Sequence, residues 1–213
     1  MNQLVRLVNE WDQFEQANPG GDISNFCRYY LAKEQAGKKI KNFEGRVPPT
    51  DESTLAKIMG RILGAFSIYH HAAMHKAGAP FRETFYFLNS LDTLKEAKKT
   101  ELIQYMFIEY TTGMDALSKL IKAGYIKERR HDTDKRAKLV SLTKKGEKML
   151  QSLYPFMTRT TQLLFKDMHP EAIKLCISLL ADVELKQSQT IYDLKPADLD
   201  GMFDDVTSGT NKK

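Results

Sequence analysis

Apolar residues recur at intervals of three and four along most of the chain, which is the spacing of one face of an α-helix. This pattern predicts an amphipathic helix over residues 1–17. After a break at residues 18–21 it predicts a second short helix, which Asp22 or Ser24 can cap. Residues 37–50 are polar and contain glycines and prolines, so we expect a linker there.

The middle of the chain is predicted to be helical as well. A long helix begins near Asp51, carries one broad apolar stripe and ends at Gly78. Three shorter helices are expected over residues 81–93, 98–105 and 111–123. Gly124 follows the last of these at the position where glycine commonly ends a helix.

The period of the pattern changes after Gly124. Residues 125–129 and 138–142 have the pattern of short strands, and the polar residues between them predict a hairpin. Thr143 can cap the helix that follows, and Pro155 is expected to kink it. A last helix follows His169-Pro170, and the chain becomes polar from about Pro196.

Positive charge is concentrated around this predicted hairpin. Residues 119–148 contain eleven Lys or Arg and four Asp or Glu, a net charge of +7, whereas the whole chain carries +5. A charge gathered in one segment is typical of a nucleic-acid footprint, although a solvated face remains an alternative.

Two short helices followed by a basic hairpin form the order of a winged helix-turn-helix. We expect a set of apolar residues to hold the two helices together: Leu102, Met106, Ile108, Leu117 and Leu120. The second helix would then lie in the major groove, and its first residues, Thr111 and Thr112, could bond phosphate oxygens beside the positive helix end. The predicted fold class is mainly α with a small β-hairpin wing, a winged helix-turn-helix domain plus a helical dimerisation region.

Four short motifs in this order resemble the MarR family of transcriptional regulators. They are Glu101-Leu102 at the start of the first helix, Lys119-Leu120 with Gly124-Tyr125-Ile126, Asp134-Lys135-Arg136 in the wing, and Leu142-Thr143-Lys144-Lys145-Gly146. The resemblance covers about residues 81–150. Two positions depart from the family pattern: Asp115 stands where a basic or other polar reader is often found, and Gly113 where a branched apolar residue is usual.

The resemblance implies a homodimer that binds a pseudo-palindromic site on double-stranded DNA, in many members released by a small aromatic ligand. It implies that Arg136 enters the minor groove and that Asp134 braces the wing. Together with the exposed positions of the second helix and the hairpin, the expected DNA-binding residues are Thr111, Thr112, Asp115, Ser118, Lys119, Arg129, Arg130, Asp134, Lys135, Arg136 and Lys138.

The corresponding division of the chain has five parts. We expect a helical extension for dimerisation (1–50), a long dimerisation or linker helix (51–80), the DNA-binding domain (81–145), C-terminal dimerisation helices (146–195) and a flexible tail (196–213). The dimer interface is expected to bury Leu4, Leu7, Trp11, Ile173, Ile177 and Leu180. A repressor is favoured. A winged-helix module for protein interaction, and a ligand or redox sensor without direct specific DNA binding, remain alternatives.

A group of histidines and phenylalanines suggests where a ligand could bind. His71, His75, Phe81 and Phe85 form the candidate pocket, with membership of the hydrophobic core as the alternative for the phenylalanines. His71 and His75 have the spacing of two metal ligands, but no Cys or carboxylate pair completes such a site, so we expect no metal and no cofactor.

Catalytic motifs are absent from the sequence, so we expect no enzyme. Cys27 and Cys176 lie far apart in helical surroundings and are expected to be small buried hydrophobic residues, with a thiol redox switch as the alternative. Neither a signal peptide nor an apolar run of membrane-spanning length is evident, which favours a cytoplasmic protein with no membrane association.

Overall fold

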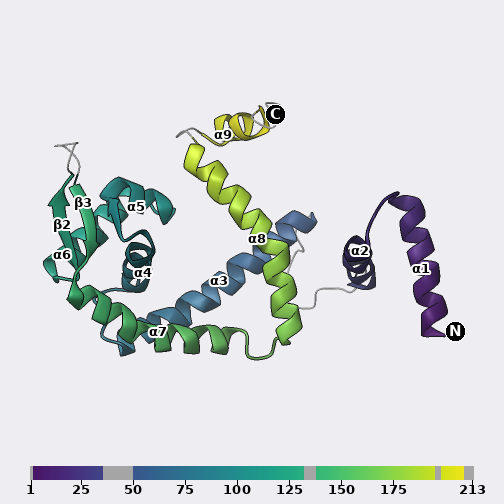
Figure 1. Cartoon of the computed structure of the whole chain (residues 1–213), viewed down its shortest axis with the longest axis horizontal. Coiled ribbons are helices and arrows are strands. Elements are labelled where there is room, and N and C mark those ends of the chain that lie inside the picture. Colours follow the sequence, from purple (N-terminus) through teal and green to yellow (C-terminus); the bar gives the residue numbers. More distant parts are fainter. Residues whose placement is uncertain (1, 36–49, 132–137, 195–197, 209–213) are drawn as a thin grey trace. The chain divides into compact units, whose positions relative to one another are not determined.

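The structure, a computed structural model, describes residues 2–35, 50–131, 138–194 and 198–208. The chain divides into two compact units, residues 1–57 and 58–213 (Figure 1).

The first unit is built on two helices, α1 (Gln3–Ala17) and α2 (Ile23–Gln35), that pack through aromatic side chains. Phe14 and Phe26 are buried, with ring centroids 5.6 Å apart, and Trp11 lies edge-on to Phe26 at 5.0 Å. Of the two predicted caps of α2, Asp22 accepts a hydrogen bond from the Asn25 N–H at 2.8 Å. Helices α1 and α2 therefore share a small aromatic core of their own.

Helix α3 (Asp51–Lys76) begins at the end of the first unit, and most of it belongs to the second. The elements that follow are α4 (Thr84–Leu94), β1 (Glu96–Lys98), α5 (Lys99–Tyr105), α6 (Tyr110–Lys122), β2 (Ile126–Arg130), β3 (Lys138–Leu142), α7 (Lys144–Leu164), α8 (Pro170–Asp193) and α9 (Leu199–Ser208). The predicted fold class, mainly helical with a small hairpin, is confirmed.

The strands form one antiparallel sheet in the order β1-β3-β2. Both outer strands pair with Val140 of β3, β1 through Ala97 and β2 through Glu128. The sequence predicted β2 and β3 but not β1, whose three residues are too few to show an alternating pattern.

The hydrophobic core lies where α4, α5, α6 and the sheet meet, and Met74 of α3 and Leu150 and Leu153 of α7 also belong to it (Figure 1). Leu102, Leu117 and Leu120 are fully buried, and Met106 and Ile108 pack against the same cluster. The residues predicted to hold the two short helices together therefore do so. Because α5 and α6 are short, this shared core rather than helix propensity fixes their mutual angle.

The C-terminal helices agree with the sequence pattern at their ends. Thr143 caps α7 by accepting a hydrogen bond from the Gly146 N–H at 3.1 Å, as predicted, and His169 is the residue before α8. Pro155 lies inside α7, which continues to Leu164. In the segment expected to be a flexible tail, residues 199–208 form helix α9, which its polar composition did not predict.

The expectation that both cysteines are buried is wrong: Cys27 and Cys176 are exposed. On α2 the neighbouring Phe26 takes the packed side of the helix, which leaves Cys27 outside. On α8 no residue is buried, so Cys176 has no core to enter in the single chain. Helical spacing shows that a stripe is apolar but not what covers it.

Candidate nucleic-acid interface

Helix α6 has one buried and one exposed face. Its buried face, which includes Leu117 and Leu120, joins the core. Its exposed face carries five of the predicted DNA-binding residues: Thr111, Thr112, Asp115, Ser118 and Lys119. Lys119 pairs with Asp115 one turn earlier, with Nζ and Oδ2 2.6 Å apart. The core therefore holds a polar helix face outward, as a major-groove reader requires.

Gly113 explains how closely α6 approaches α5. A Cβ atom at this position would lie 2.5 Å from Ile103 Cγ1, well inside normal carbon–carbon contact. The glycine that departs from the family pattern is thus matched to the bulky Ile103 on the neighbouring helix.

The N-terminal end of α6 is capped by Glu109, a residue that the sequence analysis missed. Its two carboxylate oxygens accept hydrogen bonds from the Thr111 N–H at 2.8 Å and the Thr112 N–H at 2.7 Å. These bonds lower the pKa of Glu109 to about 2, so the side chain is ionised at neutral pH. Ser, Thr, Asp and Asn are the residues that signal a cap in sequence, so a Glu here gave no signal.

The C-terminal end of α6 is met by Lys145 from the first turn of α7. Its ammonium donates to the Ala123 carbonyl at 2.7 Å and lies 4.6 Å from the centre of the Tyr125 ring. A cation at this end complements the negative end of the helix dipole. The ammonium group of Lys145 thus makes its contacts within the protein, at the end of α6.

The base of the wing is an ion-pair network. Arg129 Nε donates to Glu96 Oε1 at 2.7 Å, which ties β2 to the short strand β1. Glu128 pairs with Lys99 and, at 3.4 Å, with Lys138, and the Lys99 ammonium is the main reason that the pKa of Glu128 is lowered. Two predicted DNA-binding cations, Arg129 and Lys138, therefore already have acidic partners.

The remaining predicted DNA-binding residues fall into two groups. Arg130 is exposed at the end of β2. Asp134, Lys135 and Arg136 lie outside the described residues, so their predicted roles in the wing stay predictions.

A cavity of about 610 Å³ lies beside the N-terminal half of α6. Its lining comes from α4, α5 and α6 and from the segments next to them, and includes Arg82, Tyr86, Tyr105 and Thr112. Next to Tyr86, at 4.9 Å between ring centroids, the His70 side chain is 2% exposed, and its Nε2 lacks a hydrogen-bond partner among the described residues. Burial is the main cause of the lowered pKa of His70.

The four residues predicted to form a ligand pocket are not gathered at this cavity. His71 and His75 are exposed on α3, whereas Phe85 belongs to the hydrophobic core and Phe81 packs against it. The core alternative stated for the phenylalanines is the one observed. His70, one position away from His71, is the histidine that faces the aromatic side chains.

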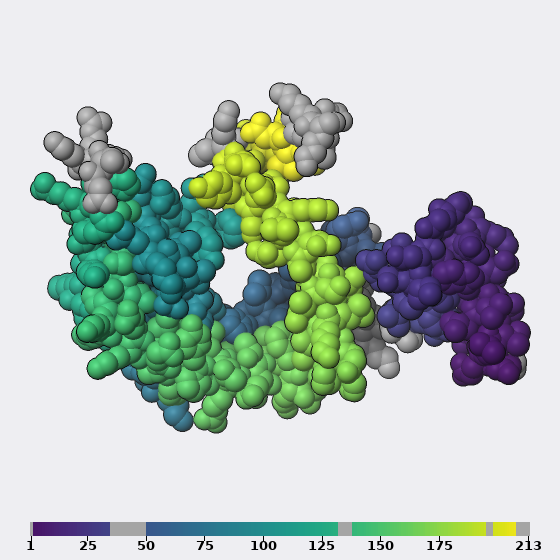
Figure 2. Space-filling model, viewed as in Figure 1, coloured from purple at the N-terminus to yellow at the C-terminus, as the bar shows by residue number. Residues whose placement is uncertain are grey.

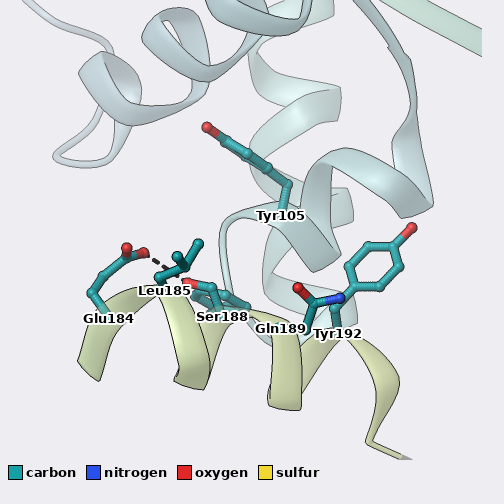
Figure 3. Close-up of a pocket in the computed structure, with 7 residues that line it drawn as sticks. Tyr105, Glu184, Leu185, Ser188, Gln189 and Tyr192 are labelled. Atoms are coloured by element: carbon teal, nitrogen blue, oxygen red, sulfur yellow. Dashed lines mark hydrogen bonds between the residues drawn. The ribbon is translucent and has the colours of Figure 1, made fainter. Parts of the chain in front are cut away.

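A second cavity, of about 420 Å³, lies between the end of α5 and the C-terminal part of α8 (Figure 3). Tyr105 faces Leu185 and Tyr192 across it, and Gln104 donates a hydrogen bond to the Tyr192 carbonyl at 2.9 Å. The side chain of Ser188 is held within its own helix by a hydrogen bond to Glu184 at 2.7 Å.

Within the described parts of the chain, no three His, Cys, Asp or Glu side chains gather where they could hold a metal ion. Among those same residues, no helix is both long and apolar enough to cross a bilayer.

Comparison with known proteins agrees with this geometry. Residues 82–146 match the family model of a winged helix DNA-binding domain, which is not an enzyme family. A search of curated protein sequences found no match.

Solved structures of similar fold are MarR-family regulators. A mutant of MarR from E. coli complexed with operator DNA is 18% identical, with a TM-score of 0.56 over 61% of this chain and 92% of that one. A MarR transcriptional regulator from Methanosarcina mazei Go1 is 23% identical, with a TM-score of 0.56 over 63% and 97%. A MarR family regulator from Streptomyces coelicolor in complex with DNA is 19% identical, with a TM-score of 0.57 over 67% and 91%.

The motifs of the sequence, the three-stranded wing sheet on a helical core and the matched domain model agree. Residues 82–146 match the model of a winged helix DNA-binding domain, and the chain has the fold of the MarR-family transcriptional regulators, as its sequence predicts.

Proposed function

We propose that the protein is a homodimeric transcriptional regulator that binds a pseudo-palindromic site on double-stranded DNA, and that it acts as a repressor. The observation that carries the proposal is the exposed polar face of α6, held outward by the core beside a basic wing. Two of the proteins with a similar fold are described as complexes with DNA. Residues 81–145 would form the DNA-binding part.

The wing supplies the charge for this function. Lys127 and Arg130 are exposed on β2, and the sequence places Lys135 and Arg136 in the turn that follows. Basic residues on a hairpin beside the recognition helix can contact the phosphates and the neighbouring minor groove. Arg136 is the residue that we expect to enter that groove.

Dimerisation is supported by α8, in which none of the 24 residues is buried. The exposed side chains include Ile177, Val183 and Leu185, at 62%, 53% and 65% exposure, and Figure 2 shows one side of the helix open over most of its length. Helix α3 likewise leaves Met59, Ile62 and Leu63 exposed. Apolar stripes of this length mark an interface, and a second copy would cover both.

Fluorescence anisotropy across a salt series tests DNA binding. The labelled duplex is one that the protein itself selects from a random pool, and the Arg136→Ala variant is compared with Lys166→Ala, which removes the same charge from an exposed site after α7. We expect Arg136→Ala to weaken binding and Lys166→Ala to leave it nearly unchanged. Equal effects of the two substitutions would mean that only total charge matters and would count against recognition by the wing.

An effector role is supported by the 610 Å³ cavity, because its lining includes Thr112 and Ala116 of α6 itself. An aromatic ligand there would contact the recognition helix directly, and an anionic group on it would have to compete with Glu83, which pairs with Arg82 at 2.7 Å. Addition of 4-hydroxybenzoate to the preformed DNA complex tests this: release of DNA that Arg82→Ala abolishes supports the site, and unchanged anisotropy at millimolar ligand argues against it.

A further inference from the structure

The carboxylate of Glu109 lies at the N-terminal end of the recognition helix α6. The first N–H groups of a helix have no partner within it, and together with the helix dipole they form a ready site for an anion such as a DNA phosphate. In this chain the N–H groups of Thr111 and Thr112 already bond the two carboxylate oxygens of Glu109, at 2.8 and 2.7 Å. The anion site is filled by the protein's own side chain.

This occupancy has two effects on an approaching phosphate. The two N–H donors are no longer free, and the phosphate meets a carboxylate that is exposed and ionised. Both effects act against binding to the phosphate backbone, which supplies most of the affinity for DNA of unrelated sequence.

The other charged residues of α6 do not restore the attraction between this helix and a DNA phosphate. From residue 109 to residue 122 the two acidic residues, Glu109 and Asp115, balance the two basic ones, Lys119 and Lys122, so the net charge is zero. The Lys119 ammonium is moreover paired with Asp115 at 2.6 Å. Positive charge lies instead in the wing and the segments around it.

We propose that Glu109 is a specificity-determining residue that keeps backbone phosphates away from the N-terminus of α6. The proposal rests on the DNA-binding function proposed above. If α6 gains little affinity from phosphates, the protein must gain its affinity for DNA from base contacts and from the wing. Binding to unrelated sequences is then weakened more than binding to the cognate site. Discrimination by a repulsive element of this kind is a general route to specificity.

Two substitutions separate charge from capping. Glu109→Asn removes the charge and keeps a side chain that caps helices well, whereas Glu109→Asp keeps both. Each variant and the wild type are titrated against a random-sequence duplex and against the duplex that the wild type selects, from 50 to 200 mM salt. Far-UV circular dichroism confirms that both variants are folded.

We expect Glu109→Asn to bind the random duplex more tightly, with a plot of log affinity against log salt that is steeper by about 0.9 for one added phosphate contact. Over this fourfold range of salt, that slope corresponds to an affinity gain for the variant, relative to wild type, that is about 3.5-fold larger at 50 than at 200 mM. The preference for the selected duplex should fall, and Glu109→Asp should match the wild type.

The outcomes separate this inference from the proposed function. If the wild type binds its selected duplex but Glu109→Asn has an unchanged slope and unchanged preference, the role of Glu109 is refuted and DNA binding stands. If Glu109→Asp behaves like Glu109→Asn, charge is not the cause and the inference also fails. If neither the wild type nor the variants bind any duplex, the proposed function itself is refuted, and the inference with it.

Discussion

The close approach of α5 and α6 at Gly113 should make the stability of the fold sensitive to any side chain at this position. In Gly113→Ala the new methyl group would lie 2.5 Å from Ile103 Cγ1 and 2.9 Å from Ile103 Cδ1, so about 1 Å of overlap must be relieved. Overpacking of this kind costs about 1–3 kcal/mol, and replacing a helical glycine by alanine returns about 1 kcal/mol. We therefore expect the single variant to lose about 0–2 kcal/mol in the free energy of unfolding.

A double-mutant cycle isolates the contact. Ile103→Ala alone leaves a cavity and should cost about 2–5 kcal/mol. In the double variant the overlap is gone and the methyl group introduced at position 113 fills part of that cavity, while the helix-propensity gain is kept. The double variant should thus be about 0.5–3 kcal/mol more stable than the sum of the single effects, the range found for residues in contact.

Urea denaturation followed by circular dichroism measures these free energies, and a constant m-value shows that the unfolding transition has kept its character. If the two substitutions add within about 0.5 kcal/mol, they are independent, and Ile103 is not the reason for glycine at position 113. A more stable Gly113→Ala variant would equally contradict the close approach.

Three further predictions concern other parts of the chain. In Gly146→Ala the new Cβ atom would lie 2.1 Å from the Tyr125 carbonyl oxygen, so the backbone must shift and the melting temperature should fall by several degrees; an unchanged melting curve would refute the contact. Leu180→Asp should make the protein monomeric in sedimentation analysis because it places a charge on the apolar stripe of α8, and a dimeric variant would show that the interface lies elsewhere. The pKa of Glu109 falls from its usual 4.5 to about 2 on folding, so the stability from its ionised form is complete above 4.5 and is lost as the pH falls toward 2; Glu109→Gln should lack this component of acid unfolding, and identical acid-unfolding curves would contradict it.

The winged domain could be predicted from sequence because its signals are local. Gly124 and Thr143 each bond to a residue three positions away in the chain, Ile121 and Gly146, and the hairpin follows directly after the recognition helix. The period change after Gly124 then fixes where helices give way to strands.

Other features were missed because they depend on partners far away in sequence or on uncommon residue types. Strand β1 is defined by its pairing with β3, in which Ala97 lies opposite Val140, more than forty positions later. Arg129 was expected to bind DNA, and its pairing with Glu96, thirty-three positions earlier, could not be seen in the sequence. Periodicity marked His71 and His75 but could not show that the buried histidine is His70.

The exposure of Cys176 has a different cause. The apolar positions of α8 were expected to lie in a dimer interface, and Cys176 was expected to be buried, but within one chain no residue of α8 is buried. A pattern of apolar residues reports the need for burial, whereas the covering surface can belong to another molecule.

Selection of bound duplexes from a random pool, followed by sequencing, tests the central claim most directly. A dimer that places one α6 helix in each of two major grooves should enrich a pseudo-palindrome whose half-sites are centred about one helical turn, roughly 10 base pairs, apart, or a multiple of it. Enrichment of such a motif by the wild type, lost in Leu180→Asp, is the result predicted here. Retention of DNA at low salt with no enriched motif would contradict it, because binding would then come from the basic charge alone.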